Sequence, residues 1–324
     1  MNICPETCSD DCWADLAGGE ERTFTLADYD GGTARWCPGC GDFAVLSAMQ
    51  RICRDEGIPP ERLAVVSGIG CSSRFPHYVH AYGFHGLHGR ALPVACGVKS
   101  RRPDLDVWVA TGDGDCCSIG AGHWLHAARY NMDMVVMLFD NAIYGLTKKQ
   151  SSPTTPIGFG TNTHPDGSWL PPLDPVATML GFANVSFVAR TVDWHPPHLY
   201  ETLKAAYHHP GTGFVHILQR CPTYTPDLFE TLRRQPERML FLEHEAGIGG
   251  DGGPRFAFPN RQAHDPSDRL AAHALAARRD AIPIGLFYRD ANAPRYDQHT
   301  AVGVGQGSAE RLRALDRELD RYAV

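Results

Sequence analysis

The chain has 324 residues, a hydrophobic share of 43% and a formal charge of −7 at pH 7, which is an ordinary globular composition. The whole formal charge lies in residues 1–30, where eight acidic residues face a single Arg22. The rest of the chain is therefore neutral. It has no Lys/Arg block, so general binding to nucleic acid or to an acidic membrane surface is excluded, because both need a concentrated positive field.

The sequence also bears on the compartment in which the protein works. The sequence has no apolar run of about 18 residues, and its first residues are acidic where a secretory signal would be basic and then apolar. We therefore expect a cytoplasmic protein without a membrane span. Thiols stay reduced in that compartment, so the eleven cysteines require a reason other than disulfides.

Apolar patterns of strand and helix type alternate along the chain. Residues 1–35 are polar and Gly-rich and predict an acidic N-terminal tail. From Trp36 onward the expected elements are a helix at Phe43–Cys53, strands at Leu63–Ser67 and Val107–Thr111, a helix at Ile119–Tyr130, a strand at Met134–Asp140, a helix at Pro175–Leu180, a strand at Val185–Val188, a helix at Pro197–Tyr207 and a strand at Gly213–Leu218. Strands separated by helices pair in parallel through right-handed crossovers, so residues 36–245 predict one doubly wound α/β domain with a mainly parallel sheet.

The composition of the sequence changes after residue 245. A Gly-rich stretch and two prolines precede two short helical patterns, Ser267–Arg279 and Ser308–Tyr322, and one strand pattern, Ile284–Tyr288. We predict a C-terminal arm over residues 246–324.

Two neighbouring strands of the predicted sheet end in polar residues. Gly112-Asp113-Gly114-Asp115 follows one strand, and Asp140-Asn141 closes the next. Ligands of such sheets bind at the carboxyl ends of the strands, and Asp and Asn oxygens suit magnesium, which also takes water and phosphate oxygens. Glycines there let the backbone approach phosphates. The Gly-Asp-Gly-Asp segment alone is also typical of a surface turn, but its place at a strand end favours a magnesium–diphosphate site.

This pattern resembles the thiamine diphosphate signature, and the resemblance extends over residues 36–245. Five motifs stand in the order found in the β subunits of 2-oxoacid:ferredoxin oxidoreductases: Trp36-Cys37-Pro38-Gly39-Cys40-Gly41, Gly68-Ile69-Gly70-Cys71-Ser72-Ser73-Arg74, His85-Gly86-Leu87-His88-Gly89-Arg90, Ile143-Tyr144-Gly145-Leu146-Thr147-Lys148 and Cys221-Pro222-Thr223-Tyr224. The resemblance implies a sheet of the thiamine diphosphate-binding type and a magnesium ion held by Asp113, Asn141 and the carbonyl of Ile143. The remaining residues that it implies around the cofactor are Ser72, Ser73, His88, Gly112, Gly114, Asp115, Gly145 and Leu146.

Four cysteines fall at the same predicted edge. The spacing of Cys37 and Cys40 suits two corners of a metal site, and Cys71 and Cys221 follow strands. Four thiolates suit structural zinc or a four-iron, four-sulfur cluster, and spacing does not separate the two. The resemblance implies that these four residues ligate one 4Fe–4S cluster.

The other cysteines carry weaker predictions. Cys53 and Cys96 are expected to pack as small buried hydrophobes. Cys116 and Cys117 follow the magnesium ligand Asp113, and residue 116 departs from the small residue usual in the family. A final group, spaced by four residues in the tail, has no assigned role: Cys4, Cys8 and Cys12.

A 2-oxoacid carboxylate needs a cation, and Arg74 and Lys148 lie beside the cofactor motifs. We predict that these two residues serve the substrate. The family usually has Lys-Gly-Gln where this chain has Lys148-Lys149-Gln150, which leaves the role of the second lysine open. The histidines His77, His80 and His85 stand among aromatic residues, where packing is the simpler interpretation.

The resemblance implies oxidative decarboxylation of a 2-oxoacid, electron transfer through the cluster to ferredoxin, and transfer of the acyl group to coenzyme A. We favour 2-oxoglutarate as the substrate, with pyruvate as the other candidate. A thiamine enzyme also needs a pyrimidine-binding half with a Glu, which the resemblance assigns to an α subunit in an α2β2 assembly. Two alternatives are a non-redox thiamine carboligase or decarboxylase and a zinc-binding non-catalytic module.

Overall fold

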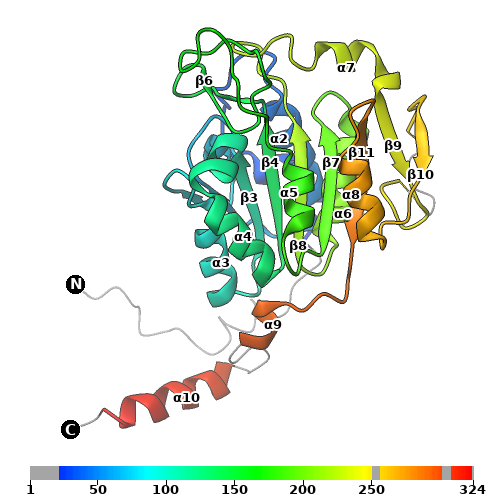
Figure 1. Cartoon of the computed structure of the whole chain (residues 1–324). Helices are drawn as coiled ribbons and strands as arrows, with labels where there is room; N and C mark the ends of the chain where they lie inside the picture. The colour runs from blue at the N-terminus through cyan, green and yellow to red at the C-terminus, as the bar shows by residue number, and fades with distance from the viewer. Residues whose placement is uncertain (1–21, 250–255, 301–307, 323–324) are drawn as a thin grey trace.

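A computed structural model describes residues 22–249, 256–300 and 308–322, and strands and helices alternate through them (Figure 1). Nine strands of the described chain form one sheet: β1 (Leu63–Ser67), β2 (Tyr82–His85), β3 (Asp106–Gly112), β4 (Met134–Asp140), β7 (Phe187–Val192), β8 (Thr212–Leu218), β9 (Met239–Glu243), β10 (Arg261–Ala263) and β11 (Ile282–Arg289). Two further strands pair only with each other, β5 (Ile143–Tyr144) and β6 (Gln150–Ser151). The helices are α2 (Asp42–Asp55), α3 (Ala91–Arg101), α4 (Ala121–Tyr130), α5 (Pro175–Gly181), α6 (Pro196–Tyr207), α7 (Glu230–Arg234), α8 (Arg269–Ala276), α9 (Tyr296–Thr300) and α10 (Ser308–Asp320).

The sheet is mainly parallel, as the alternation of elements predicts. Its order is β10-β9-β11-β7-β8-β4-β3-β1-β2. All neighbours pair in parallel except β11 and β7, which are antiparallel. Every residue of β1, β4, β7 and β8 is buried, as expected for central strands covered on both faces.

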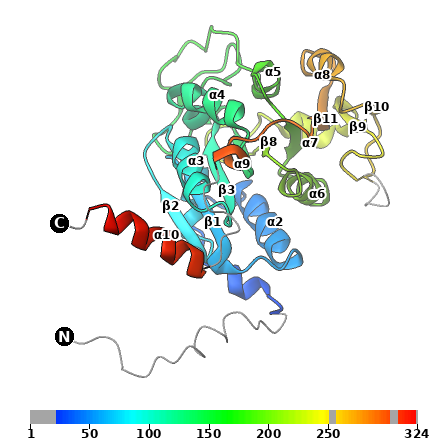
Figure 2. The same cartoon turned by 90° about the horizontal axis from the view of Figure 1, so that it is seen from below.

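Helices cover both faces of the sheet (Figure 2). On one face α2 packs against α6 over a core that includes Trp108 and Phe187, and on the other α3 packs against α4 and α5 against α8 over a core that includes Trp124 and Phe214. Two layers of helix around one sheet confirm the predicted doubly wound α/β fold.

The apolar runs give the strand bounds well, and β1 and β4 begin and end at the predicted residues. The strand β7 differs, because the prediction ended at Val188 and the strand continues to Val192 through a buried Arg190. A buried charge needs a partner, and Asp174 supplies it with both oxygens 2.9 Å from the guanidinium. The pattern along the strand contains no sign of that partner.

Segments outside the predicted central domain contact the body closely. In the described part of the predicted tail, the Tyr29 side chain is buried and its hydroxyl lies 2.9 Å and 2.7 Å from the carbonyls of Cys53 and Ile58. The strands β10 and β11 belong to the predicted arm and continue the sheet beside β9 and β7. The domain boundaries at 35/36 and 245/246 stay predictions, and the sheet runs across the second.

The strand ends fix where a site can form. Register pairs Ser67 with Ala110, Gly112 with Phe139 and Asp140 with Leu218. The residues that follow β1, β3, β4 and β8 therefore meet at one edge, where ligands of such sheets bind.

Candidate functional site

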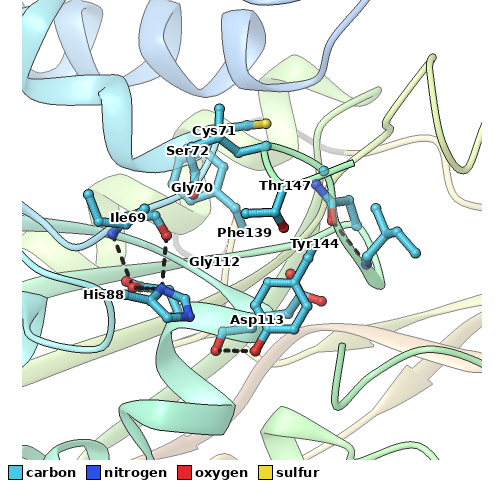
Figure 3. Close-up of a pocket in the computed structure, with 16 residues that line it drawn as sticks. Ile69, Gly70, Cys71, Ser72, His88, Gly112, Asp113, Phe139, Tyr144 and Thr147 are labelled. Carbon is cyan, nitrogen blue, oxygen red and sulfur yellow. Dashed lines mark hydrogen bonds and ion pairs between the residues drawn. The ribbon is translucent and has the colours of Figure 1, made fainter. Parts of the chain in front are cut away.

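A cavity of about 260 Å³ lies at this edge (Figure 3). All but one of the residues predicted to bind the cofactor line it: Ser72, His88, Gly112, Asp113, Gly114, Asp115, Asn141, Ile143, Gly145 and Leu146. The predicted cluster ligand Cys71 lines the same cavity. The remaining residue, Ser73, is fully buried and does not line the cavity. The fold therefore brings the predicted groups together from four separate segments of the sequence.

The carboxylate of Asp115 holds the loops around the cavity in place. It is buried and accepts hydrogen bonds from the backbone N–H groups of Ile69 (3.1 Å) and Gly89 (2.6 Å) and from the Thr111 hydroxyl (2.7 Å). His88 Nδ1 lies 2.8 Å from the same carboxylate. Asp115 therefore fixes two of the predicted diphosphate loops, which is a structural role for a residue predicted to bind through its backbone.

The Asp113 carboxylate is buried beside a second acid. One hydroxyl, that of Thr154, lies 2.9 Å from Asp113 and 2.7 Å from Asp140. A hydroxyl has a single proton, so it satisfies only one of the two carboxylates at a time. Burial, and then the neighbouring Asp140, raise the pKa of Asp113 above its ordinary value. A cation beside Asp113 would relieve both effects.

Asn141 presents the other predicted magnesium ligand. Its Nδ2 donates to Gln219 Oε1 at 2.8 Å, and its Oδ1 accepts from the Ile143 N–H at 3.2 Å. The nitrogen end of the amide is thereby held, which leaves the oxygen as the end available to a cation. The Ile143 carbonyl belongs to the cavity-lining turn that begins there.

The aromatic ring of Tyr144 forms a wall of the cavity that the sequence prediction missed (Figure 3). It lies against Gly114, where an added Cβ would stand only 2.1 Å from a ring carbon, and its hydroxyl donates to the Gly114 carbonyl at 3.1 Å. Position 114 therefore requires glycine because the Tyr144 ring leaves no room for a Cβ atom.

The loop after Tyr144 carries both lysines outside the cavity lining. Lys148 is exposed, and Lys148 and Lys149 adopt φ values of +74° and +67°. Such left-handed backbone is uncommon for residues other than glycine and clusters at functional sites. A glycine would adopt this conformation without strain, so Lys149 occupies a backbone position that is unfavourable for its side chain.

Arg74 lies in a neighbouring hollow of about 590 Å³ together with Arg35, His77 and His85, and this hollow shares Leu146 with the cofactor cavity. The Arg74 guanidinium lies 5.7 Å from the centre of the Tyr78 ring. Neither Arg74 nor Lys148 lines the cofactor cavity, and the prediction of a catalytic role for them stays a prediction.

The four predicted cluster cysteines come from three loops at one end of the sheet. The Cys37–Cys40 turn closes through the Cys40 N–H and the Cys37 carbonyl at 3.0 Å. Trp36 Nε1 donates to the Cys71 carbonyl at 2.7 Å, and the Tyr224 N–H lies 3.4 Å from Cys221 Sγ. The first and last of these contacts close their own loops, and the Trp36 side chain joins the first loop to the Cys71 loop.

The thiols of these loops influence one another electrostatically. Burial raises the pKa of Cys71 to about 12, with contributions from Asp42, Cys221 and Cys37. Burial and Asp42 also raise the pKa of Cys40, and the Cys71 thiol raises it further. Buried thiolates of this kind need positive charge nearby. Within residues 22–249, 256–300 and 308–322, no three or more His, Cys, Asp or Glu side chains are grouped to hold a single metal ion.

The remaining cysteines divide as follows. Cys53 and Cys96 are buried and unpaired in the two cores, which agrees with the predicted packing role. Cys116 and Cys117 are buried in a π-helical turn, Asp115–Ile119, that leads into α4. Neither lines the cavity. The tail residues Cys4, Cys8 and Cys12 lie outside the described residues.

The sequence analysis missed two residues that contact the predicted ligands, Thr154 and Gln219. Their partners in the site lie between 14 and 179 residues away along the chain. Gln219 directly follows a predicted strand at the cofactor edge, and that position was the one available signal.

The comparisons with known proteins agree with this geometry. A family model described as the thiamine pyrophosphate enzyme C-terminal TPP binding domain matches residues 68–217, and one described as the C-terminal part of the pyruvate ferredoxin oxidoreductase beta subunit matches residues 258–303. The 2-oxoglutarate oxidoreductase subunit KorB of Mycobacterium tuberculosis is 46% identical over 212 residues, which are 65% of this chain and 57% of that protein. The β subunit of 2-oxoacid:ferredoxin oxidoreductase 2 of Aeropyrum pernix is 42% identical over 255 residues, 78% of this chain and 79% of that protein.

A solved structure is also similar over most of the chain. The 2-oxoglutarate:ferredoxin oxidoreductase of Magnetococcus marinus, with 2-oxoglutarate, coenzyme A and succinyl-CoA bound, has a chain that is 37% identical, with a TM-score of 0.75 over 91% of this chain and 96% of that one. The fold and the site thus define a thiamine diphosphate-binding domain. The chain belongs to the β subunits of 2-oxoacid:ferredoxin oxidoreductases.

Family membership confirms the resemblance read from the sequence motifs and favours the oxidoreductase over the carboligase and the zinc module. A β subunit implies a partner α subunit. In the described part of the chain, every helix is too short or too polar to cross a membrane.

Proposed function

We propose that this chain, with its α subunit, catalyses oxidative decarboxylation of 2-oxoglutarate by means of thiamine diphosphate, magnesium and one 4Fe–4S cluster. The observation that supports this most is the composition of one cavity: Asp113 and Asn141 line it together with Cys71. The oxygen ligands of a magnesium–diphosphate site and a thiol ligand of a cluster thus face a common space at one sheet edge.

The residues fit a magnesium ion by their charge and their donor atoms. The Asp113 and Asp140 carboxylates lie on one shared hydroxyl, and burial and the neighbouring acid raise the pKa of Asp113, so a cation beside Asp113 would stabilise the charged pair. Asp113, Asn141 and the Ile143 carbonyl supply the hard oxygen atoms that magnesium prefers. Ser72 and the backbone of Gly112–Asp115 would then line the diphosphate, in loops that Asp115 holds rigid.

The residues also fit a cluster. Cys37, Cys40, Cys71 and Cys221 are all free thiols, and burial makes a thiolate at Cys71 or Cys40 unfavourable without a cation. Iron supplies that positive charge, and Cys₄ is the ordinary ligand set of a 4Fe–4S cluster.

When bound, thiamine diphosphate supplies carbanion-stabilising chemistry, and the cluster takes up electrons singly. This chain orients the diphosphate through Asp113 and Asn141, while Tyr144 and Phe139 exclude water from the cavity. Lys148 and Arg74, which lie near residues that line the cavity, would supply positive charge for the substrate carboxylate. We assign 2-oxoglutarate as the substrate, coenzyme A as the acyl acceptor and ferredoxin as the electron acceptor, because relatives bind or are named for these molecules.

The α subunit would supply the pyrimidine-binding half and its Glu in an α2β2 assembly. The cysteine chemistry suits a reducing cytoplasm.

The test is anaerobic purification of the chain with its α subunit, followed by assay of iron, sulfide, zinc and thiamine. The expected result is about four iron atoms and four sulfides per β chain, with thiamine retained. Asp113→Ala should lose thiamine and magnesium but keep the cluster chromophore, whereas the exposed control Asp166→Ala should keep all of them. A colourless protein with stoichiometric zinc, or joint loss of cluster and thiamine in Asp113→Ala, would overturn the proposal.

A further inference from the structure

Gln219 stands directly after β8, between the two predicted cofactor sites. Its side chain is 1% exposed, and its backbone N–H donates to the Asp140 carbonyl at 2.9 Å, which extends the β4–β8 pairing by one residue. The register therefore sets Gln219 beside Asn141, at the edge where β4 and β8 both end.

The acceptor end of the Gln219 amide contacts the magnesium side. Oε1 accepts the hydrogen bond from Asn141 Nδ2 at 2.8 Å. An asparagine amide has an oxygen end and a nitrogen end, and a cation binds only the oxygen. By holding the nitrogen, Gln219 fixes the rotation of Asn141 that offers Oδ1 to a cation.

The donor end of the same amide contacts the cysteine side. Nε2 donates to Cys40 Sγ at 3.2 Å and to the Arg220 carbonyl at 2.6 Å. The two N–H groups of a primary amide account for both bonds. Both polar atoms of the Gln219 side chain thus have hydrogen-bond partners. The oxygen faces the predicted magnesium site, and the nitrogen faces the predicted cluster site.

No other natural side chain of this length can make the same set of contacts. A glutamate keeps the acceptor and loses the donor, and a methionine keeps the volume and loses both. The side chain is buried, so water does not compete for either contact.

We propose that Gln219 is a positioning residue shared by the two cofactors: its amide orients Asn141 for magnesium and stabilises the Cys40 thiolate of the cluster. This inference rests on the proposed function, since it takes the magnesium and cluster sites as assigned there. The inference makes both the affinity for magnesium and the reduction potential of the cluster depend on Gln219.

Two consequences follow from the chemistry. Outer-shell partners of metal ligands typically change metal affinity by about 10- to 100-fold when removed. Reduction adds negative charge to a cluster, and hydrogen bonds to its sulfur atoms stabilise that charge and so raise its reduction potential.

The experiment uses the complete complex of the chain with its α subunit and three variants. Gln219→Met should weaken magnesium binding about tenfold, measured as the magnesium concentration that retains thiamine diphosphate. It should also lower the ratio of reduced to oxidised cluster at a fixed potential, measured by redox titration with EPR. A tenfold lower ratio corresponds to about 59 mV for a one-electron couple.

Gln219→Glu separates the two contacts. It keeps the acceptor for Asn141, so magnesium binding should stay close to that of the unchanged protein while the cluster potential falls. Gln50→Met is the matched control, because it removes an amide that donates to the Tyr29 and Tyr78 carbonyls at 3.1 Å and 3.4 Å, away from both sites. It should leave affinity and potential unchanged.

The outcomes distinguish this inference from the proposed function. If the unchanged complex holds no cluster or no thiamine, the proposed function fails. If the unchanged complex holds both and Gln219→Met matches it in magnesium affinity and in potential, Gln219 has no positioning role. Equal losses of magnesium affinity in Gln219→Glu and Gln219→Met would also overturn the inference.

Discussion

At the scale of single residues, the contact between Gly114 and the Tyr144 ring controls the shape of the cofactor cavity. Gly114 has a helical φ of −68°, so alanine meets no backbone strain there. The added Cβ would nevertheless stand 2.1 Å from the ring, so the ring, which lines the cavity, would have to move.

We predict that Gly114→Ala binds thiamine diphosphate about tenfold to a hundredfold more weakly, since overpacking of this kind costs about 1–3 kcal/mol. Isothermal titration of the apo complex measures this. Gly97→Ala is the control, because Gly97 lies within α3 and an added Cβ there meets nothing within 4 Å. It should stabilise the chain by about 0.5–1 kcal/mol with unchanged binding, and equal affinities in the two variants would contradict the assigned role of the ring.

At the scale of elements, a chain of polar groups, buried except for the partly exposed Asp174, ties α5 to the strands that end at the site. Asp174 is the N-cap residue of α5, and its side chain accepts hydrogen bonds from the N–H groups of Val176 and Ala177. It also binds Arg190 on β7, whose Nε donates to His216 Nδ1 on β8 at 3.0 Å. His216 Nε2 in turn lies 2.8 Å from Asp140, next to the cavity.

Removing Asp174 should therefore cost far more than removing a helix cap. Asp174→Ala leaves the Arg190 charge buried without its acid, which typically costs about 3–5 kcal/mol. Asp268→Ala removes a comparable cap of α8, which accepts from the Ala271 N–H at 2.9 Å on the exposed surface, and should cost about 1 kcal/mol. Urea unfolding of both variants measures the difference, and equal losses would show that the Arg190 pair contributes nothing.

The same elements show what a sequence pattern can and cannot predict. Apolar runs such as β4 reveal their bounds because each residue, apart from Asp140 at the end, is buried for its own hydrophobicity. The bounds of β7 depend on Arg190 and its acid sixteen residues away, and β2 was missed because all of its residues are exposed at the sheet edge.

The residues of the site also fall into those that the sequence could predict and those that it could not. Residues that directly follow parallel strands, such as Asp113 and Asn141, could be predicted to converge, because strand ends share one edge. Thr154 follows no parallel strand, so its place beside Asp113 could not be predicted. Gln219 directly follows β8, so its place at the edge could be predicted, but its contacts with Asn141 and Cys40 could not.

At the scale of the whole molecule, an aromatic cluster joins the C-terminal strands to the central sheet. His198 on α6 is fully buried and contacts Phe241 of β9 and the rings of Phe256 and Phe258. Its Nδ1 lies 2.8 Å from the Thr191 hydroxyl, and its Nε2 has no hydrogen-bond partner in the described chain. Residues on both sides of the predicted boundary at 245/246 therefore meet around one neutral imidazole.

This imidazole makes the fold sensitive to acid. Burial, and then the nearby His195, lower the pKa of His198 from 6.5 to about 3. Between these two values the unfolded chain binds a proton that the folded chain does not, so stability falls as the pH is lowered from about 6.5 toward 3. One such group contributes about 1.4 kcal/mol per pH unit, or about 2 kcal/mol between pH 7 and pH 5.

We predict that His198→Asn, which cannot titrate, loses about 2 kcal/mol less stability than the unchanged chain between pH 7 and pH 5. Urea unfolding at the two pH values measures this, and the difference between them cancels the packing that the substitution removes. His126→Asn, on the exposed surface of α4, should keep the pH dependence of the unchanged chain. If His198→Asn and His126→Asn show the same pH dependence, His198 is charged in the fold and the junction between the C-terminal strands and α6 is open to water.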